Sequence, residues 1–153
     1  MSDWSRKTKE VPFESLRPEM VTAISNHIQQ YHLGPVLSDT LMCVETESEK
    51  VRRGLFGSAE IASMGTVVTP RWLIWVISGR KTGIAVLSAK LRDIVVRDYA
   101  QTQFAKMIPD TGIEVSGRFT DTSENISAFI GVEENQAGRK FIEVVLQAVQ
   151  NAQ

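Results

Sequence analysis

The sequence has little cysteine, no excess of either charge and no long apolar run. Cys43 is the only cysteine among 153 residues, which excludes an intramolecular disulfide and a cysteine-cluster metal site. Seventeen Lys and Arg residues stand against 18 Asp and Glu residues, so no net field attracts nucleic acid or an anionic bilayer from a distance. We therefore expect no metal and no nucleic-acid partner, and we interpret Cys43 as a small apolar filler of a strand.

Membrane-spanning and secretory segments are also missing. The longest apolar run, from Trp72 to Ile77, is far shorter than the ~20 residues that a transmembrane helix needs. The first ten residues, MSDWSRKTKE, are polar and lack the apolar stretch of a secretory signal. From these absences we expect a cytoplasmic protein.

Catalytic signatures do not occur in the sequence. It has no GxSxG, P-loop, dinucleotide or HExxH motif. Its two histidines, His27 and His32, lie in one short segment and offer little for a nucleophile–base pair. We expect no enzymatic activity and no cofactor.

Two amphipathic helices are predicted near the ends of the chain. After a flexible tail over residues 1–14, residues 15–36 are expected to form a helix and a linker, because apolar residues recur on one half of the helical wheel. Pro18 is acceptable in the first turn, and Gly34-Pro35 ends the helix. The second helix follows Asn135, a plausible N-cap, and carries a broad apolar stripe from Phe141 to Ala152.

About seven short strands are expected between residues 40 and 132. Nothing clearly helical separates them, which favours antiparallel pairing over βαβ units. Residues 98–111 fit either a strand extension or a short helical insert. In the run after Pro70, alternate residues point to opposite faces, and both sets, Trp72-Ile74-Val76 and Leu73-Trp75-Ile77, are apolar. This strand is therefore expected to be covered on both sides, or to have one face at an interface.

The order of these elements resembles the pleckstrin-homology-like (PH-like) barrel, most closely its bacterial branch. The similar stretches are VVTPRWLIWV (residues 67–76), LRDIVVRD (91–98) and AGRKFIEVVLQAV (137–149). The resemblance implies a mostly β, α+β fold: an antiparallel seven-stranded barrel or sandwich over residues 37–153, capped by its C-terminal helix. The N-terminal helix is an addition to the plain domain.

Basic residues gather in two predicted connections. Lys50, Arg52 and Arg53 lie between the first two predicted strands, and Arg80 and Lys81 lie in the next hairpin turn. The resemblance implies a loop that grips phosphates, and convergent Lys and Arg donors suit phosphate because charge-assisted hydrogen bonds are strong. The spacing departs from the family's K…(K/R)xR arrangement, and three glutamates just upstream offset the field. The alternative is a solvated turn with ordinary charges.

The apolar residues on both faces of the strand after Pro70 and on one half of the N-terminal helix predict association with another protein surface. The residues we expect at an interface are Met20, Ile24, His27, Ile28, Tyr31 and Trp75. We consider three roles for His27: a pH switch, a ligand, or a packed histidine at the interface. We expect a non-catalytic interaction or scaffold module that associates with itself, as a homo-oligomer, or with another protein. The alternative is a peripheral adaptor that binds anionic lipid headgroups or phospho-ligands through the basic connection, with at most weak contact with an anionic membrane.

Overall fold

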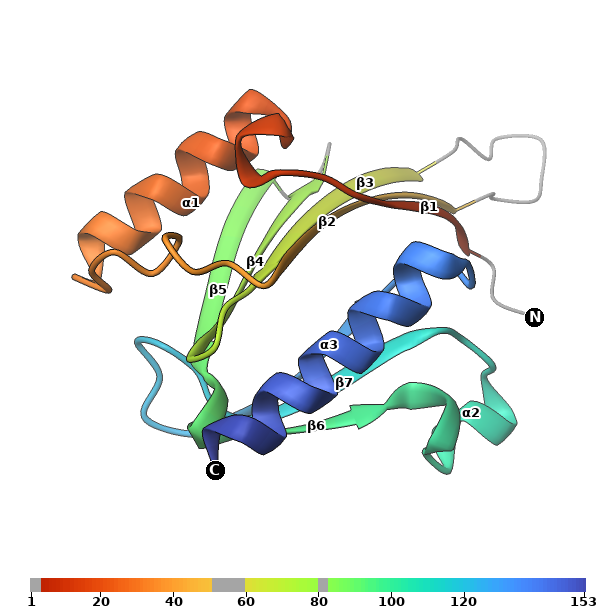
Figure 1. The fold of residues 1–153 in the computed structure, drawn as a ribbon. Helices are drawn as coiled ribbons and strands as arrows, with labels where there is room; N and C mark the ends of the chain where they lie inside the picture. The colour runs from red at the N-terminus through yellow and green to blue at the C-terminus, as the bar shows by residue number, and fades with distance from the viewer. Residues whose placement is uncertain (1–3, 51–59, 80–82) are drawn as a thin grey trace.

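Two antiparallel β-sheets and three α-helices make up the described part of the chain. The structure, a computed structural model, describes residues 4–50, 60–79 and 83–153. The first sheet has five strands in chain order: β1 (Trp4–Glu10), β2 (Met42–Lys50), β3 (Glu60–Val68), β4 (Trp72–Gly79) and β5 (Gly83–Lys90). The second has three: β6 (Ile94–Asp98), β7 (Gly112–Arg118) and β8 (Asn125–Gly131). The helices are α1 (Pro18–Gln30), α2 (Phe104–Met107) and α3 (Gln136–Ala152) (Figure 1).

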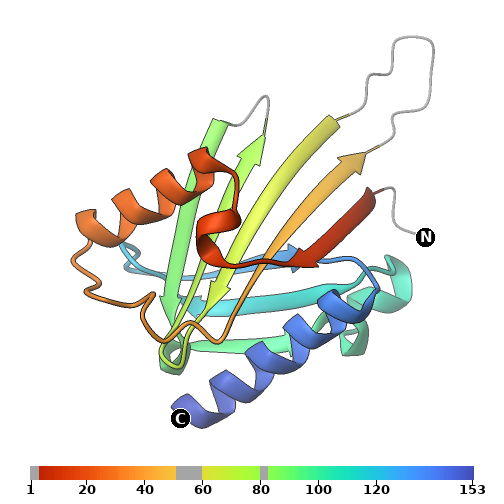
Figure 2. The ribbon, with the colours of Figure 1, turned by 45° about the horizontal axis from the view of Figure 1, so that its top comes forward.

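Strand β4 is covered on both faces, as the sequence predicts. Leu73 and Trp75 belong to an apolar core shared with the second sheet and α3. Ile74 and Val76 belong to a separate core beneath α1. The five-stranded sheet is thus the middle layer, with α1 on one side and the second sheet with α3 on the other (Figure 2).

Helix α1 packs closely on the first sheet because small and apolar groups meet there. Met20 and Ile24 are fully buried, and burying such side chains contributes about 1.5–3 kcal/mol each. A Cβ at Gly65 of β3 would lie 3.1 Å from the Leu16 side chain and from the Met20 sulfur, so the glycine permits this approach. The helix ends where Leu33 N–H donates to Ile28 O at 3.0 Å, followed by Gly34 with a φ of +81°.

Helix α3 lies across the two sheets and fills the space between them (Figure 1). The Asn135 side chain accepts a hydrogen bond from Gly138 N–H at 2.8 Å, which confirms the predicted N-cap. Phe141, Ile142 and Val145 are buried against both sheets. The predicted wide apolar stripe therefore reflects contact with two layers at once.

The prediction of a flexible tail over residues 1–14 is wrong for Trp4–Glu10, which forms the edge strand β1. β1 pairs antiparallel with β2, and its Thr8 is also held by the segment that leads into α3. The Thr8 N–H donates to Glu133 Oε1 at 2.9 Å, and the Thr8 hydroxyl accepts from Glu133 N–H at 2.8 Å. Contacts with residues more than 120 positions away fix this segment, and local sequence patterns carry no trace of them.

The chain is mixed α+β with mostly antiparallel sheets, and the strand number differs from the expectation. The described residues form eight strands in two sheets rather than seven, because β1 adds one. The ambiguous segment 98–111 is helical: a 3-10 turn at Tyr99–Gln101 is followed by α2. No helix in the described part of the chain is long and apolar enough to cross a membrane.

Candidate functional site

The predicted basic site lies mostly outside the described residues. Lys50 ends β2, where it pairs with Trp4 of β1 and Glu60 of β3. Arg52, Arg53, Arg80 and Lys81 are not among the described residues. The strand ends beside them are described, and Lys50 and Gly79, the last residues of β2 and β4, lie at the same end of the sheet. The topology therefore brings the flanks of both basic connections to one end of the sheet.

The structure places four of the six predicted interface residues, Met20, Ile24, His27 and Trp75, inside the protein. Met20 and Ile24 are buried between α1 and the first sheet, and Trp75 is buried on the opposite face of that sheet. The apolar surplus that predicts an interface is used within the chain, since α1 covers the second face of β4. These side chains are therefore not surface of a single chain, and that prediction is corrected. Ile28 and Tyr31 are only half-buried.

His27 joins α1 to two other elements. Its Nε2 lies 2.8 Å from the Ser88 hydroxyl of β5, and that hydroxyl donates to Thr120 Oγ1 at 2.7 Å. Its ring centroid lies 4.7 Å from that of Tyr31, whose hydroxyl donates to Asp121 at 3.2 Å. His27 is thus a packed, hydrogen-bonded histidine of an intramolecular contact.

Cys43 lies in β2 within the core beneath α1 and is 3% exposed. Burial, with a smaller effect of the nearby Glu45 carboxylate, raises the pKa of its thiol to about 12. The thiol is therefore protonated and inert at neutral pH, as expected of an apolar filler. Among the described residues, no group of three or more His, Cys, Asp and Glu side chains could hold a metal ion.

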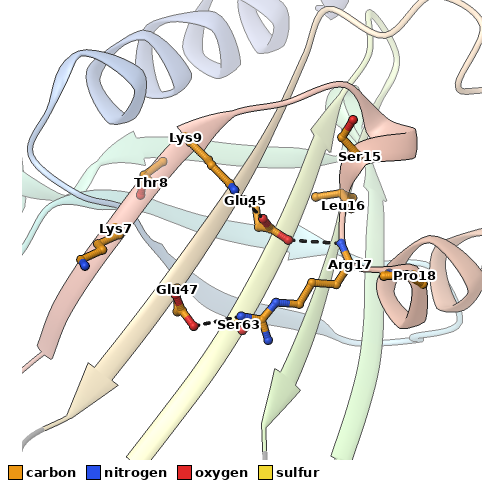
Figure 3. A pocket seen from close by; sticks show the side chains of 10 residues that line it. All are labelled: Lys7, Thr8, Lys9, Ser15, Leu16, Arg17, Pro18, Glu45, Glu47 and Ser63. Atoms are coloured by element: carbon orange, nitrogen blue, oxygen red, sulfur yellow. Dashed lines mark hydrogen bonds and ion pairs between the residues drawn. The ribbon is translucent and has the colours of Figure 1, made fainter.

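A hollow of about 460 Å³ opens beside β1, β2 and the start of α1 (Figure 3). Its charged side chains are Lys7, Lys9, Arg17, Glu45 and Glu47. The Arg17 N–H donates to Glu45 Oε1 at 3.2 Å, and its guanidinium donates to Glu47 Oε1 at 2.9 Å. Lys9 Nζ lies 3.6 Å from Glu45 Oε2. Both carboxylates thus already contact cations, and the Arg17 contacts with Glu45 and Glu47 brace the start of α1 against β2.

An apolar surface projects from the insert between β6 and β7. Phe104 is 64% exposed, Met107 83% and Ile108 65%, all within five positions. The insert is nevertheless anchored: the Tyr99 hydroxyl donates to Ile108 O at 2.7 Å, and the Tyr99 ring packs on Phe129 at 4.9 Å between centroids. We call Phe104, Met107 and Ile108 the α2 surface. Sequence reasoning missed it, although the run FAKMIP contains the signal.

A hollow of about 650 Å³ adjoins the α2 surface. It is lined by Val96, Arg97, Asp98, Gln101, Thr102, Gln103, Phe104 and Glu114. Polar side chains and the Phe104 ring line this hollow, so it can receive an apolar side chain flanked by a cation.

No family model, curated protein or solved structure matches this chain.

Proposed function

We propose that this chain is a non-catalytic interaction module that associates with a second copy of itself through the α2 surface. The observation that carries the proposal is the exposure of Phe104, Met107 and Ile108 on an anchored insert. Single exposed apolar residues are ordinary, whereas clustered large ones typically mark a docking site. A fixed backbone lowers the entropic cost of binding, which favours a surface of this kind.

Complementarity within the surface favours a second copy as the partner. A two-fold axis sets the same patch against itself, so Met107 of each copy faces the hollow beside Phe104 of the other. Lys106 lies on α2, and Arg97, Asp98 and Glu114 line the hollow, so each copy presents two charges of each sign. With 17 basic and 18 acidic residues, two copies repel each other little.

We also propose a PH-like architecture elaborated at its N-terminus. Without β1, seven antiparallel strands remain in two sheets, followed by α3 as the closing helix. This is the order that the sequence resemblance implies over residues 37–153. On this proposal β1 and α1 are additions that extend one sheet and cover its outer face.

Light scattering tests the proposed self-association. A single chain has a mass of 17.0 kDa, and we expect the wild type to exceed this at micromolar concentration. The double substitution Met107→Asp and Ile108→Ser leaves the core intact and should weaken association by at least about tenfold, because central apolar contacts dominate interface energy. Ile84→Asp, at another exposed apolar position, is the matched control and should leave the mass unchanged.

Two results would overturn the proposal. One is a wild-type chain that remains monomeric up to millimolar concentration. The other is an oligomer that Ile84→Asp disrupts as strongly as the double substitution does, which would place the contact elsewhere.

The adaptor function remains a second proposal, supported by the topology of the first sheet. The flanks of both basic connections lie at one end of the first sheet. Replacing Lys50, Arg52 and Arg53 by Ala should abolish binding to anionic liposomes at low salt. If the wild type does not bind such liposomes, this function is excluded.

A further inference from the structure

A basic hollow of about 560 Å³ lies where β4 begins, β5 ends and α3 ends. It is lined by Pro70, Arg71, Trp72, Lys90, Arg92, Asn151 and Ala152. Figures 1 and 2 show the C-terminal end of α3 beside the corner at which the chain passes from β5 to β6. This corner is at the opposite end of the first sheet from Lys50, because Trp72 pairs with Lys90 while Gly79 pairs with Gly83.

The charge in this hollow is of one sign. Arg71, Lys90 and Arg92 are all exposed, and none of the lining residues is acidic. Within the described part of the chain, no carboxylate forms an ion pair with any of the three. In the hollow beside α1, by contrast, two glutamates accompany the three cations. Cations that line one hollow without a carboxylate partner repel one another, and an anion between them relieves that repulsion.

Backbone contacts fix the turn that carries Arg71, and a ring contact places Lys90. The Thr69 hydroxyl accepts hydrogen bonds from the N–H groups of Arg71 at 3.2 Å and Trp72 at 2.9 Å. Leu91 N–H donates to Arg71 O at 2.9 Å, which ties the Arg71 turn to the end of β5. Lys90 Nζ lies 5.9 Å from the centroid of the Trp72 ring, where the ring's π-electrons attract an ammonium group. The backbone that carries Arg71 and the place of Lys90 are therefore fixed before any ligand arrives.

We propose that this corner is a binding site for the phosphate group of a small phosphorylated ligand. A phosphate monoester carries about −1.5 to −2 charge at pH 7 and three strong acceptor oxygens. The Arg71 and Arg92 guanidiniums supply planar forks of donors that match those oxygens, and Lys90 supplies a point charge. Trp72 steers Lys90 and forms an apolar wall beside the phosphate. The site is separate from the α2 surface and from both predicted basic connections.

Nuclear magnetic resonance titration of the full-length chain with inorganic pyrophosphate, at constant ionic strength, tests the site. We expect saturable shifts of the Arg71, Lys90 and Arg92 amides and of the Trp72 indole N–H. Replacing Arg71, Lys90 and Arg92 together by Ala should weaken binding by more than about tenfold, since one charge-assisted hydrogen bond alone contributes about that much. The side chains are exposed, so the variant should keep the wild-type fold, which its remaining resonances report.

A charge-matched variant separates site binding from general attraction. Replacing Lys7, Arg118 and Lys140 by Ala removes three exposed cations elsewhere and should leave the affinity unchanged. Equal weakening by both triple variants would overturn the proposal, and so would a wild type whose corner resonances do not shift.

The last experiment measures binding of the chain to vesicles of phosphatidylcholine and phosphatidylserine in a 4:1 ratio. Binding to them with no saturable pyrophosphate binding would assign the corner to a membrane and overturn the phosphate site.

Discussion

At the scale of single residues, His27 shows how one polar side chain can connect three elements. It is 9% exposed and reaches Ser88 of β5 and, through it, Thr120 in the connection between β7 and β8. Because the charged imidazolium is poorly solvated there, burial lowers the pKa of His27 from its ordinary value of 6.5. The neutral ring is thus the form that fits between α1 and the sheet.

The lowered pKa predicts a loss of stability in mild acid. Below about pH 6.5 the unfolded chain binds a proton at His27 that the native chain does not, so the free energy of unfolding falls as pH decreases toward the native pKa. His27→Gln retains a donor for Ser88 and does not titrate. Urea unfolding of both proteins at a pH above 6.5 and at a pH below it should show the smaller acid-induced drop in the variant. An equal drop in both would contradict the assignment.

At the scale of elements, α1 is part of the core although it lies outside the main run of strands, between β1 and β2. Met20 and Ile24 fill the core beneath it, and Gly65 lets it approach β3. The ion pair of Arg17 with Glu47 and the hydrogen bond from the Arg17 backbone N–H to Glu45 brace its start against β2. This ion pair is solvated and contributes little, so the apolar contacts dominate the docking energy.

Truncating the buried face of α1 should be costly. Met20→Ala is expected to lower the free energy of unfolding by about 2–5 kcal/mol, because it leaves a cavity between the helix and β3. Gln29→Ala, on the exposed face of the same helix, should change it by less than about 0.5 kcal/mol. Chemical denaturation compares the two. Similar effects would mean that α1 is not packed as described.

At the scale of the whole molecule, one core joins both sheets and α3. Phe141 is fully buried there, and the Trp75 and Phe119 rings meet edge to face with centroids 5.2 Å apart. Thr8 and Glu133 connect the first strand with the approach to the last helix. The second sheet has no core apart from the one that it shares with the first sheet and α3, so the two sheets should unfold together.

A single cooperative transition is therefore expected. Near-ultraviolet circular dichroism, sensitive to the Trp75 environment, and far-ultraviolet circular dichroism should give the same denaturation midpoint. Phe141→Ala should lower both midpoints together, at a cost of about 3–5 kcal/mol. Two separated transitions, or a shift in only one signal, would indicate that the sheets are independent units.

Parts of the fold and of its surfaces were predictable because their signals are local. The periodicity from Leu16 to Tyr31 indicated a helix with one apolar half, and the two apolar faces of Trp72–Ile77 indicated a strand covered on both sides. Sequence reasoning could not tell that these two surfaces cover each other, and so it assigned Met20, Ile24 and Trp75 to an interface. That pairing depends on the path of the chain between them.

The amino-acid sequence by itself determined the two long helices, α1 and α3, and the strand that is covered on both faces, since periodicity is a property of neighbours along the chain. Only the tertiary structure decided that the polar N-terminal segment is an edge strand, and that Arg71, Lys90 and Arg92 share one corner. Residues 71 and 90 lie 19 positions apart, and antiparallel register brings them together. Such proximity arises from strand pairing, which involves the whole chain.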